Sequence, residues 1–160
     1  MVASEHYHVG IVVPDLEAGR ARLTELFGVA WGPIVEFDAL PILDASGNEL
    51  EVPNRICYSA SAPHLELIQE VPGTVWECNE YSNLHHIGFW SDSVTADSTR
   101  FSASHCPLQI CGRDGRVPST FAYHRDPLGF RIELFDVDLK PGMEETMFKP
   151  APQVSSDTKC

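Results

Sequence analysis

The chain has 160 residues, 43% of them hydrophobic, which suits one compact globular unit or two small modules sharing a core. Its 11 basic and 23 acidic residues give a formal charge of -12, and this negative excess disfavours a nucleic-acid partner because it repels phosphate. No apolar run reaches the length of a membrane span, and the N-terminus has neither a basic region nor an apolar signal core. The five cysteines form no C-x-x-C pair. We therefore expect a cytoplasmic protein with reduced thiols and no membrane partner.

The first half of the chain opens with a β-branched stretch at 6–13 that predicts a strand. Apolar residues at helical spacing then predict an amphipathic helix over 16–27, with Asp15 as its N-cap and Gly28 at its end. Further strands are expected at 34–37, 49–52, 55–60 and 64–70, with Pro53 interrupting the pair in the middle. This order predicts a β-α-β-β-β unit.

A turn-rich linker at 71–83 leads into a second half of the same kind. Here the pattern predicts a weaker helix over 93–104 and strands at 85–90, 108–111, 119–124 and 130–137. Setting His8 on His86 places Leu16 on Val94 at the same offset of 78 residues, so the repeat continues through the helix.

The repeat predicts an α+β fold of two βαβββ modules, at 1–70 and 84–138. Neither module can bury both faces of its sheet alone. Together they are expected to form one curved mixed sheet that lines a cleft, with the helices outside. The Pro-rich remainder, 139–160, is expected to be a partly disordered tail, disordered beyond Pro150.

Each half carries a histidine on its first strand and a glutamate on its last: His8 and Glu66, then His86 and Glu133. Taken singly, each would more often be an ordinary strand residue, but the matched repeat favours a shared site. A carboxylate flanked by aliphatic residues is costly to bury unless it is paired or bound to a cation. We therefore predict that these four residues ligate a divalent metal. Nitrogen and oxygen donors without thiolate suit Zn, Fe, Ni, Co or Mn equally well.

Several motifs carry a family resemblance: H-V-G-I-V-V-P-D at 8–15, H-L-E-L-I at 64–68, H-H-I-G-F at 85–89, and R-D-P-L-G at 125–129 before I-E-L at 132–134. With them the chain resembles the vicinal oxygen chelate superfamily, which includes glyoxalase I, methylmalonyl-CoA epimerase, extradiol dioxygenases and bleomycin-resistance proteins. The resemblance runs from residue 6 to residue 137. It implies paired βαβββ modules around a metal held by the same four residues.

The resemblance also implies the chemistry: two neighbouring oxygens of a small-molecule substrate chelate the ion, and a base moves a proton. Glu51 resembles the base of the epimerases, although Val52-Pro53 departs from their motif; otherwise Glu51 is a solvated carboxylate. Glu133, as a metal-bound glutamate, is the competing base. Tyr123 resembles the substrate-orienting tyrosine of the extradiol enzymes, or it simply packs. Because His124 alternates with Tyr123, only one of the two should face the cleft.

We expect a metal-dependent isomerase, epimerase or lyase of glyoxalase type. An Fe(II) extradiol-type dioxygenase is the alternative, and it would need only two histidines and one carboxylate, which makes Glu66 surplus. A small-molecule (antibiotic) binding protein without catalysis is the third hypothesis. The linker allows a cleft within one chain or across a homodimer.

Other residues bear on the substrate. Gly10 and Gly88, two residues beyond the predicted histidine ligands, are expected to leave room for it beside the ion. Arg55 and Arg113 are candidates to bind a substrate carboxylate or phosphate, unless they face solvent. Large aromatic residues would suit an aromatic or polyketide-like ligand if they line the cleft rather than the core: Trp31, Phe89, Trp76, Trp90 and Phe121.

Overall fold

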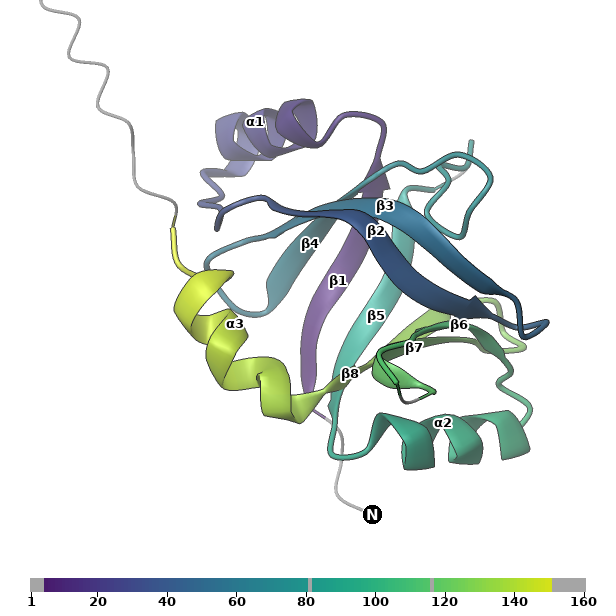
Figure 1. Cartoon of the computed structure of the whole chain (residues 1–160). Helices are drawn as coiled ribbons and strands as arrows, with labels where there is room; N and C mark the ends of the chain where they lie inside the picture. Colours follow the sequence, from purple (N-terminus) through teal and green to yellow (C-terminus); the bar gives the residue numbers. More distant parts are fainter. Residues whose placement is uncertain (1–4, 81, 116, 151–160) are drawn as a thin grey trace, which may run out of the picture.

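The computed structural model describes residues 5–80, 82–115 and 117–150, and it contains the two predicted modules (Figure 1). The first module consists of β1 (His6–Val13), α1 (Leu16–Phe27), β2 (Val35–Asp44), β3 (Glu49–Tyr58) and β4 (His64–Gln69). The second consists of β5 (Leu84–Ser91), α2 (Val94–Ala103), β6 (Leu108–Gly112), β7 (Ser119–Arg125) and β8 (Arg131–Asp136). The α+β fold of paired βαβββ modules is thereby confirmed.

Both main helices begin at the positions that the repeat predicts. The Asp15 carboxylate accepts the backbone N–H of Ala18, and the Ser93 hydroxyl accepts that of Ala96, at the same offset along the chain. Each bond satisfies one of the free N–H groups of a helix start. Gly28 ends α1 in the left-handed conformation, with φ 68°, as expected of a glycine C-cap.

The eight strands form one curved mixed sheet in the order β1-β4-β3-β2-β6-β7-β8-β5, which closes on itself because β5 also pairs with β1. The helices lie outside it, with α1 against β4 and α2 against β7 and β8 (Figure 1). Each module pairs its first and last strands in parallel, and the modules meet where β1 and β5 run antiparallel. Among the described helices, none has the length and apolar character needed to cross a membrane.

The predicted interruption at Pro53 was wrong, because β3 runs through it without a break. Proline has no N–H to donate, so it fits a strand only where no ladder bond is needed. That condition holds here: the β2–β3 register shifts between Phe37 and Leu40, opposite Pro53, and β4 pairs with β3 only from Ile56 onward. β2 likewise extends well beyond the predicted 34–37.

The C-terminal segment is more ordered than a tail. A short 3-10 helix (Val137–Leu139) leads into α3 (Lys140–Thr146), which buries Met143 in a cluster with Tyr58 and Trp90. A β-carbon at Gly32 would lie only 1.8 Å from the backbone oxygen of Met147, so the absence of a side chain there lets this segment dock. The disorder predicted beyond Pro150 falls outside the described residues.

Gly10 and Gly88 lie opposite the two predicted histidine ligands across the β1–β5 seam. Gly10 pairs with His86, and Gly88 pairs with His8. A β-carbon would lie 2.1 Å from the His86 ring at Gly10 and 1.9 Å from the His8 ring at Gly88. The room expected for substrate is therefore filled by the imidazole of the other module.

We expect Gly88→Ala to destabilise the fold by roughly 1–3 kcal/mol, because the new methyl group must displace the buried His8 ring. The free energy of unfolding from denaturant titration measures this. Gly142→Ala is the matched control, since nothing lies within 4 Å of its β-carbon and the exchange is made within α3. The control should be neutral or slightly stabilising. Equal stability of the two variants would contradict the crowding described at the seam.

Candidate metal centre

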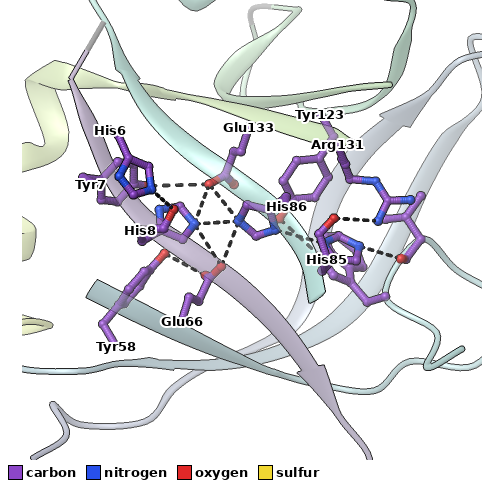
Figure 2. Close-up of polar contacts among 12 residues, drawn as sticks. His6, Tyr7, His8, Tyr58, Glu66, His85, His86, Tyr123, Arg131 and Glu133 are labelled. Carbon is purple, nitrogen blue, oxygen red and sulfur yellow. Dashed lines mark hydrogen bonds and ion pairs between the residues drawn. The ribbon is translucent and has the colours of Figure 1, made fainter. Parts of the chain in front are cut away.

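Four buried side chains from four strands converge inside the sheet: His8 of β1, Glu66 of β4, His86 of β5 and Glu133 of β8 (Figure 2). One donor atom from each lies within 4.8 Å of the others. The structure therefore brings together the four residues that the repeat groups, and all four come from one chain.

The donor atoms are arranged around a common point. The Nε2 atoms of His8 and His86 lie 2.5 Å apart, and Glu66 and Glu133 flank this pair from opposite sides (Figure 2). The Glu66 carboxylate is 3.3 Å from His8 Nε2 and 3.2 Å from His86 Nε2. The corresponding distances from Glu133 are 3.2 and 3.4 Å. Two bare imidazole nitrogens this close would repel each other, so the arrangement requires a proton or a cation between them.

The opposite charges of the cluster raise the pKa of the histidine and lower the pKa values of the glutamates. Burial alone would lower the pKa of His8, but the close carboxylates of Glu133 and Glu66 outweigh burial and raise the pKa to about 9. Burial alone would raise the carboxyl pKa values, yet the imidazoles hold the pKa of Glu66 and that of Glu133 below their usual range. Both carboxylates of the cluster are therefore ionised, and they stabilise positive charge on the imidazoles or on a bound cation.

Two tyrosines support the carboxylates. The Tyr58 hydroxyl donates to Glu66 Oε1 at 2.7 Å, which leaves Glu66 Oε2 directed at the imidazoles. The Tyr7 hydroxyl lies 3.5 Å from Glu133 Oε2. Strand alternation alone puts Tyr7 on the face opposite His8, but the β1–β5 register shifts between His6 and His8, and both Tyr7 and His8 are buried. Because of this bulge, the alternation of residues along the strand could not predict that Tyr7 contacts the site.

His85 fixes the orientation of the neighbouring histidine. Its Nε2 lies 2.7 Å from the backbone oxygen of Val75, which can only accept, so Nε2 carries the proton. Burial lowers the pKa of His85 to about 3, and its Nδ1 is therefore an acceptor, 2.8 Å from His86 Nδ1. His86 must then carry its proton on Nδ1 and present a bare Nε2 to the centre (Figure 2). The His-His pair in the sequence was the available signal for this role.

The residues fit a divalent cation. Glu66 Oε2 is buried with no hydrogen-bond partner among the described residues. A buried carboxylate oxygen is stable only when a donor or a cation meets it. The other groups supply the borderline nitrogen and hard oxygen donors that Zn and similar transition metals accept. No described thiol takes part in the cluster.

A cavity of about 290 Å³ adjoins the centre, with Glu66 and Glu133 among its lining residues. Its remaining wall is mostly apolar and aromatic, and Met143 and Met147 of the C-terminal segment close one side. Of the aromatic residues considered from sequence, Trp76 and Phe121 line the cavity. Three do not: Trp31 and Trp90 pack in two separate core clusters, and Phe89 does not reach the cavity.

Only one of the two neighbouring candidates on β7 faces the cavity. Tyr123 lines it, with its ring centroid 4.9 Å from that of His86. His124 instead points to the outer face beneath α2, where its ring nitrogens bond the Ser98 hydroxyl and the Cys106 carbonyl. The alternation expected for this pair holds, and it removes His124 from contact with a ligand in the cavity.

Glu51 lies away from the site. On β3 the inward positions are Asn54, Ile56 and Tyr58, which line the cavity, while Glu51 has the opposite phase and is exposed. A carboxylate on the outer face cannot reach a substrate inside the sheet. The geometry therefore does not support Glu51 as the base.

Of the two arginines considered as substrate contacts, one lies outside the cavity and the other lines it. Arg55 is held outside by Glu17 at 2.6 Å and by Glu36 at 2.8 Å. Arg113 lines the cavity, and its nearest carboxylate, Glu49, is 3.5 Å away.

Comparison with known proteins gives a consistent result. Residues 7–123 match the model of the Glyoxalase/Bleomycin resistance protein/Dioxygenase superfamily. No curated protein matches the chain significantly. Among solved structures, the fold is similar to a methylmalonyl-CoA epimerase in complex with methylmalonyl-CoA and NH4+, with TM-score 0.60, 16% identity, and coverage of 83% of this chain and 94% of that one.

Two further epimerase structures agree. The methylmalonyl-CoA epimerase from Mycobacterium tuberculosis gives TM-score 0.57 at 19% identity, over 96% of this chain and 95% of that one. A single-substitution variant of the Streptomyces coelicolor methylmalonyl-CoA epimerase, in complex with 2-nitronate-propionyl-CoA, gives TM-score 0.60 at 16% identity, over 93% and 99%. At such low identity these likenesses establish the fold alone.

In protein stripped of divalent ions by a chelator, the free energy of unfolding should fall as the pH rises through about 9. The folded pKa of His8 lies above its unfolded value of 6.5, so its contribution is complete below 6.5 and is lost on deprotonation. The loss should be on the order of 3 kcal/mol. Denaturant titrations between about pH 6 and pH 10 measure it. His8→Gln should reduce the decline and leave the part that comes from His86, whose pKa Glu133 and Glu66 also raise. A wild-type profile without a decline would contradict the charge state described for the cluster.

Proposed function

Because the chain belongs to the glyoxalase/bleomycin resistance protein/dioxygenase superfamily, we propose that it is a metal-dependent isomerase, epimerase or lyase of glyoxalase type, acting on a small oxygenated substrate. The observation that carries the proposal is the convergence of four buried donors beside an apolar cavity. Buried carboxylates at a cavity wall are costly unless they serve a bound cation or a reacting ligand.

In this proposal His8, Glu66, His86 and Glu133 hold Zn, Fe, Ni, Co or Mn. The bound ion supplies Lewis-acid stabilisation of the oxyanion that develops when a proton leaves the carbon next to a substrate carbonyl. Two carboxylates balance the charge of a divalent ion, so the centre is neutral and does not repel an anionic substrate.

The chain's own groups divide the remaining work. The Tyr58 hydroxyl bonds Glu66 at 2.7 Å, whereas the Tyr7 hydroxyl lies 3.5 Å from Glu133 and holds it more weakly. Glu133 is therefore the freer carboxylate and the better candidate to take and return the proton. Tyr123 is paired with Glu133 across β7 and β8 and borders the cavity, where its hydroxyl can orient a substrate oxygen. Burial raises the pKa of Tyr123, which keeps the phenol protonated.

The geometry bears on the two alternatives. An extradiol-type Fe(II) dioxygenase needs two histidines and one carboxylate as ligands, so the second carboxylate, Glu66, would not be needed. Here Glu66 is as buried and as close to both imidazoles as Glu133, and Tyr58 is committed to holding it. This favours a four-donor centre over a three-donor one. A binding protein without catalysis would have no need of the metal.

We also infer a cytoplasmic protein, because four of its cysteines are free thiols in the described part of the chain. The partner is a small molecule rather than nucleic acid, given the acidic excess of the chain. A homodimer is not required to complete the four-donor cluster.

Metal content of the purified protein is the direct test. Elemental analysis without chelators should find about one divalent ion per chain, and Glu66→Ala should reduce the occupancy severely. Glu51→Ala is the matched control, since that carboxylate is exposed on the outer face. Full occupancy in Glu66→Ala would support the three-donor alternative. A metal-free wild-type protein would favour the binding protein.

Replacement of His85 should weaken metal binding without removing a ligand. His85→Phe deprives His86 Nδ1–H of its acceptor, and we expect a loss of metal affinity of about 10–100-fold. His85→Gln supplies an amide oxygen and should recover part of the loss. Competition with a metal-sensitive dye measures the dissociation constants. Wild-type affinity in His85→Phe would show that the hydrogen bond does not orient His86.

A further inference from the structure

The described residues contain four buried side-chain polar atoms without a hydrogen-bond partner: His8 Nδ1, Glu66 Oε2, Arg113 Nε and Ser119 Oγ. Leaving such an atom unpaired destabilises the fold, so native proteins keep few of them and each calls for an explanation. Two of the four belong to the candidate metal centre. The other two belong to residues that line the same cavity.

Arg113 and Ser119 lie at a different end of the cavity from the metal centre. Arg113 directly follows Gly112, which pairs with Ser119 where β6 meets β7. Tyr123, four positions further along β7, pairs with Glu133 of the centre. At about 3.3 Å per residue, and with an irregularity in between, the two ends are roughly 10–13 Å apart.

The backbone next to Ser119 is strained. Thr120 has φ 51°, in the left-handed region that a β-branched residue rarely adopts. The β6–β7 register shifts at the same place, so β7 carries a bulge there. Thr120 lines the cavity between Ser119 and Phe121. Backbone strain of this kind destabilises the fold, and strained residues cluster at ligand-binding sites.

The charge at this end is available to a ligand. Among the described residues, the one ion-pair partner of Arg113 is Glu49, at 3.5 Å, and the Glu49 side chain is 65% exposed. An ion pair of this kind contributes little and leaves most of the guanidinium donors free. Asp114 also borders the cavity but is exposed. A single arginine matches one carboxylate, which it can bind through two parallel hydrogen bonds.

Most of the remaining cavity wall is apolar, formed by side chains such as Ile56, Ile68, Trp76, Phe121 and Phe135. We propose that the substrate is an elongated, largely aromatic or aliphatic carboxylic acid. Its two neighbouring oxygens lie at the metal centre, and its carboxylate accepts hydrogen bonds from Arg113 and Ser119. The first half of this statement rests on the proposed function, and the second rests on the orphaned donors.

A matched pair of probes tests the second end. Both 4-phenylcatechol and 4-(4-carboxyphenyl)catechol offer vicinal oxygens, and only the second carries the distal carboxylate. Their dissociation constants with Zn²⁺-loaded protein are measured by isothermal titration calorimetry. Wild-type protein should bind the carboxylated probe at least about tenfold more tightly, as expected of hydrogen bonds to a charged group.

Variants of Arg113 and Arg55 test which arginine is responsible for the tighter binding of the carboxylated probe. Arg113→Met should abolish it while leaving the affinity for 4-phenylcatechol within about twofold of wild type. Arg55→Met should retain the preference, because Glu17 and Glu36 hold that arginine on the outer face. Ser119→Ala should reduce the preference in part. Unfolding curves of each variant check that the fold is intact.

The outcomes separate the two ideas. If both probes bind equally well, or if Arg113→Met keeps the preference, the carboxylate anchor is overturned and the metal centre stands. If neither probe binds the Zn²⁺-loaded protein, the proposed function and the anchor fall together.

Discussion

The need to hold two carboxylates and two imidazoles together, away from water, governs this structure. Two sets of three residues, paired across neighbouring strands of the sheet, bring these side chains together. In one set Gly10 of β1 lies between Glu66 of β4 and His86 of β5, and in the other Gly88 has His8 and Glu133 as neighbours. A glycine in the middle of each set leaves space for the adjacent imidazole to lean across the strand. The four side chains then meet over the seam between the modules.

The surroundings follow from the same requirement. Buried charge must be paired and hydrogen-bonded, so tyrosine hydroxyls and a second histidine occupy the next layer. These groups hold the donors in fixed orientations. Beyond them the wall is apolar, and a cavity of about 290 Å³ with such walls lowers the local dielectric at the donors. The C-terminal segment adds to this wall through Met143 and Met147.

Much of the fold and the composition of the centre could be predicted from the sequence, because both depend on a pattern repeated at constant offset. The repeat predicted the order of the strands and helices and the four donors, and the caps of α1 were predicted from Asp15 and Gly28. The phase of β3 could not be predicted, because the expected interruption at Pro53 hid which residues face inward. Glu51 was considered as a base because it resembles the base of the epimerases, and its outward direction became visible only in the structure. α3 was missed because Pro141 and Gly142 weaken its helix propensity, and tertiary contacts of Met143 hold it instead. Bulges, as at Tyr7, leave no mark in composition.

The crossed arrangement of glycines and histidines constrains how the two halves of the chain can change. Gly10 accommodates the ring of His86, and Gly88 accommodates that of His8. A substitution in one half is therefore felt first at a donor of the other half. The two halves differ from each other at most positions, but Gly10, His86, Gly88 and His8 depend on one another, and a change at one of them requires a compensating change at its partner.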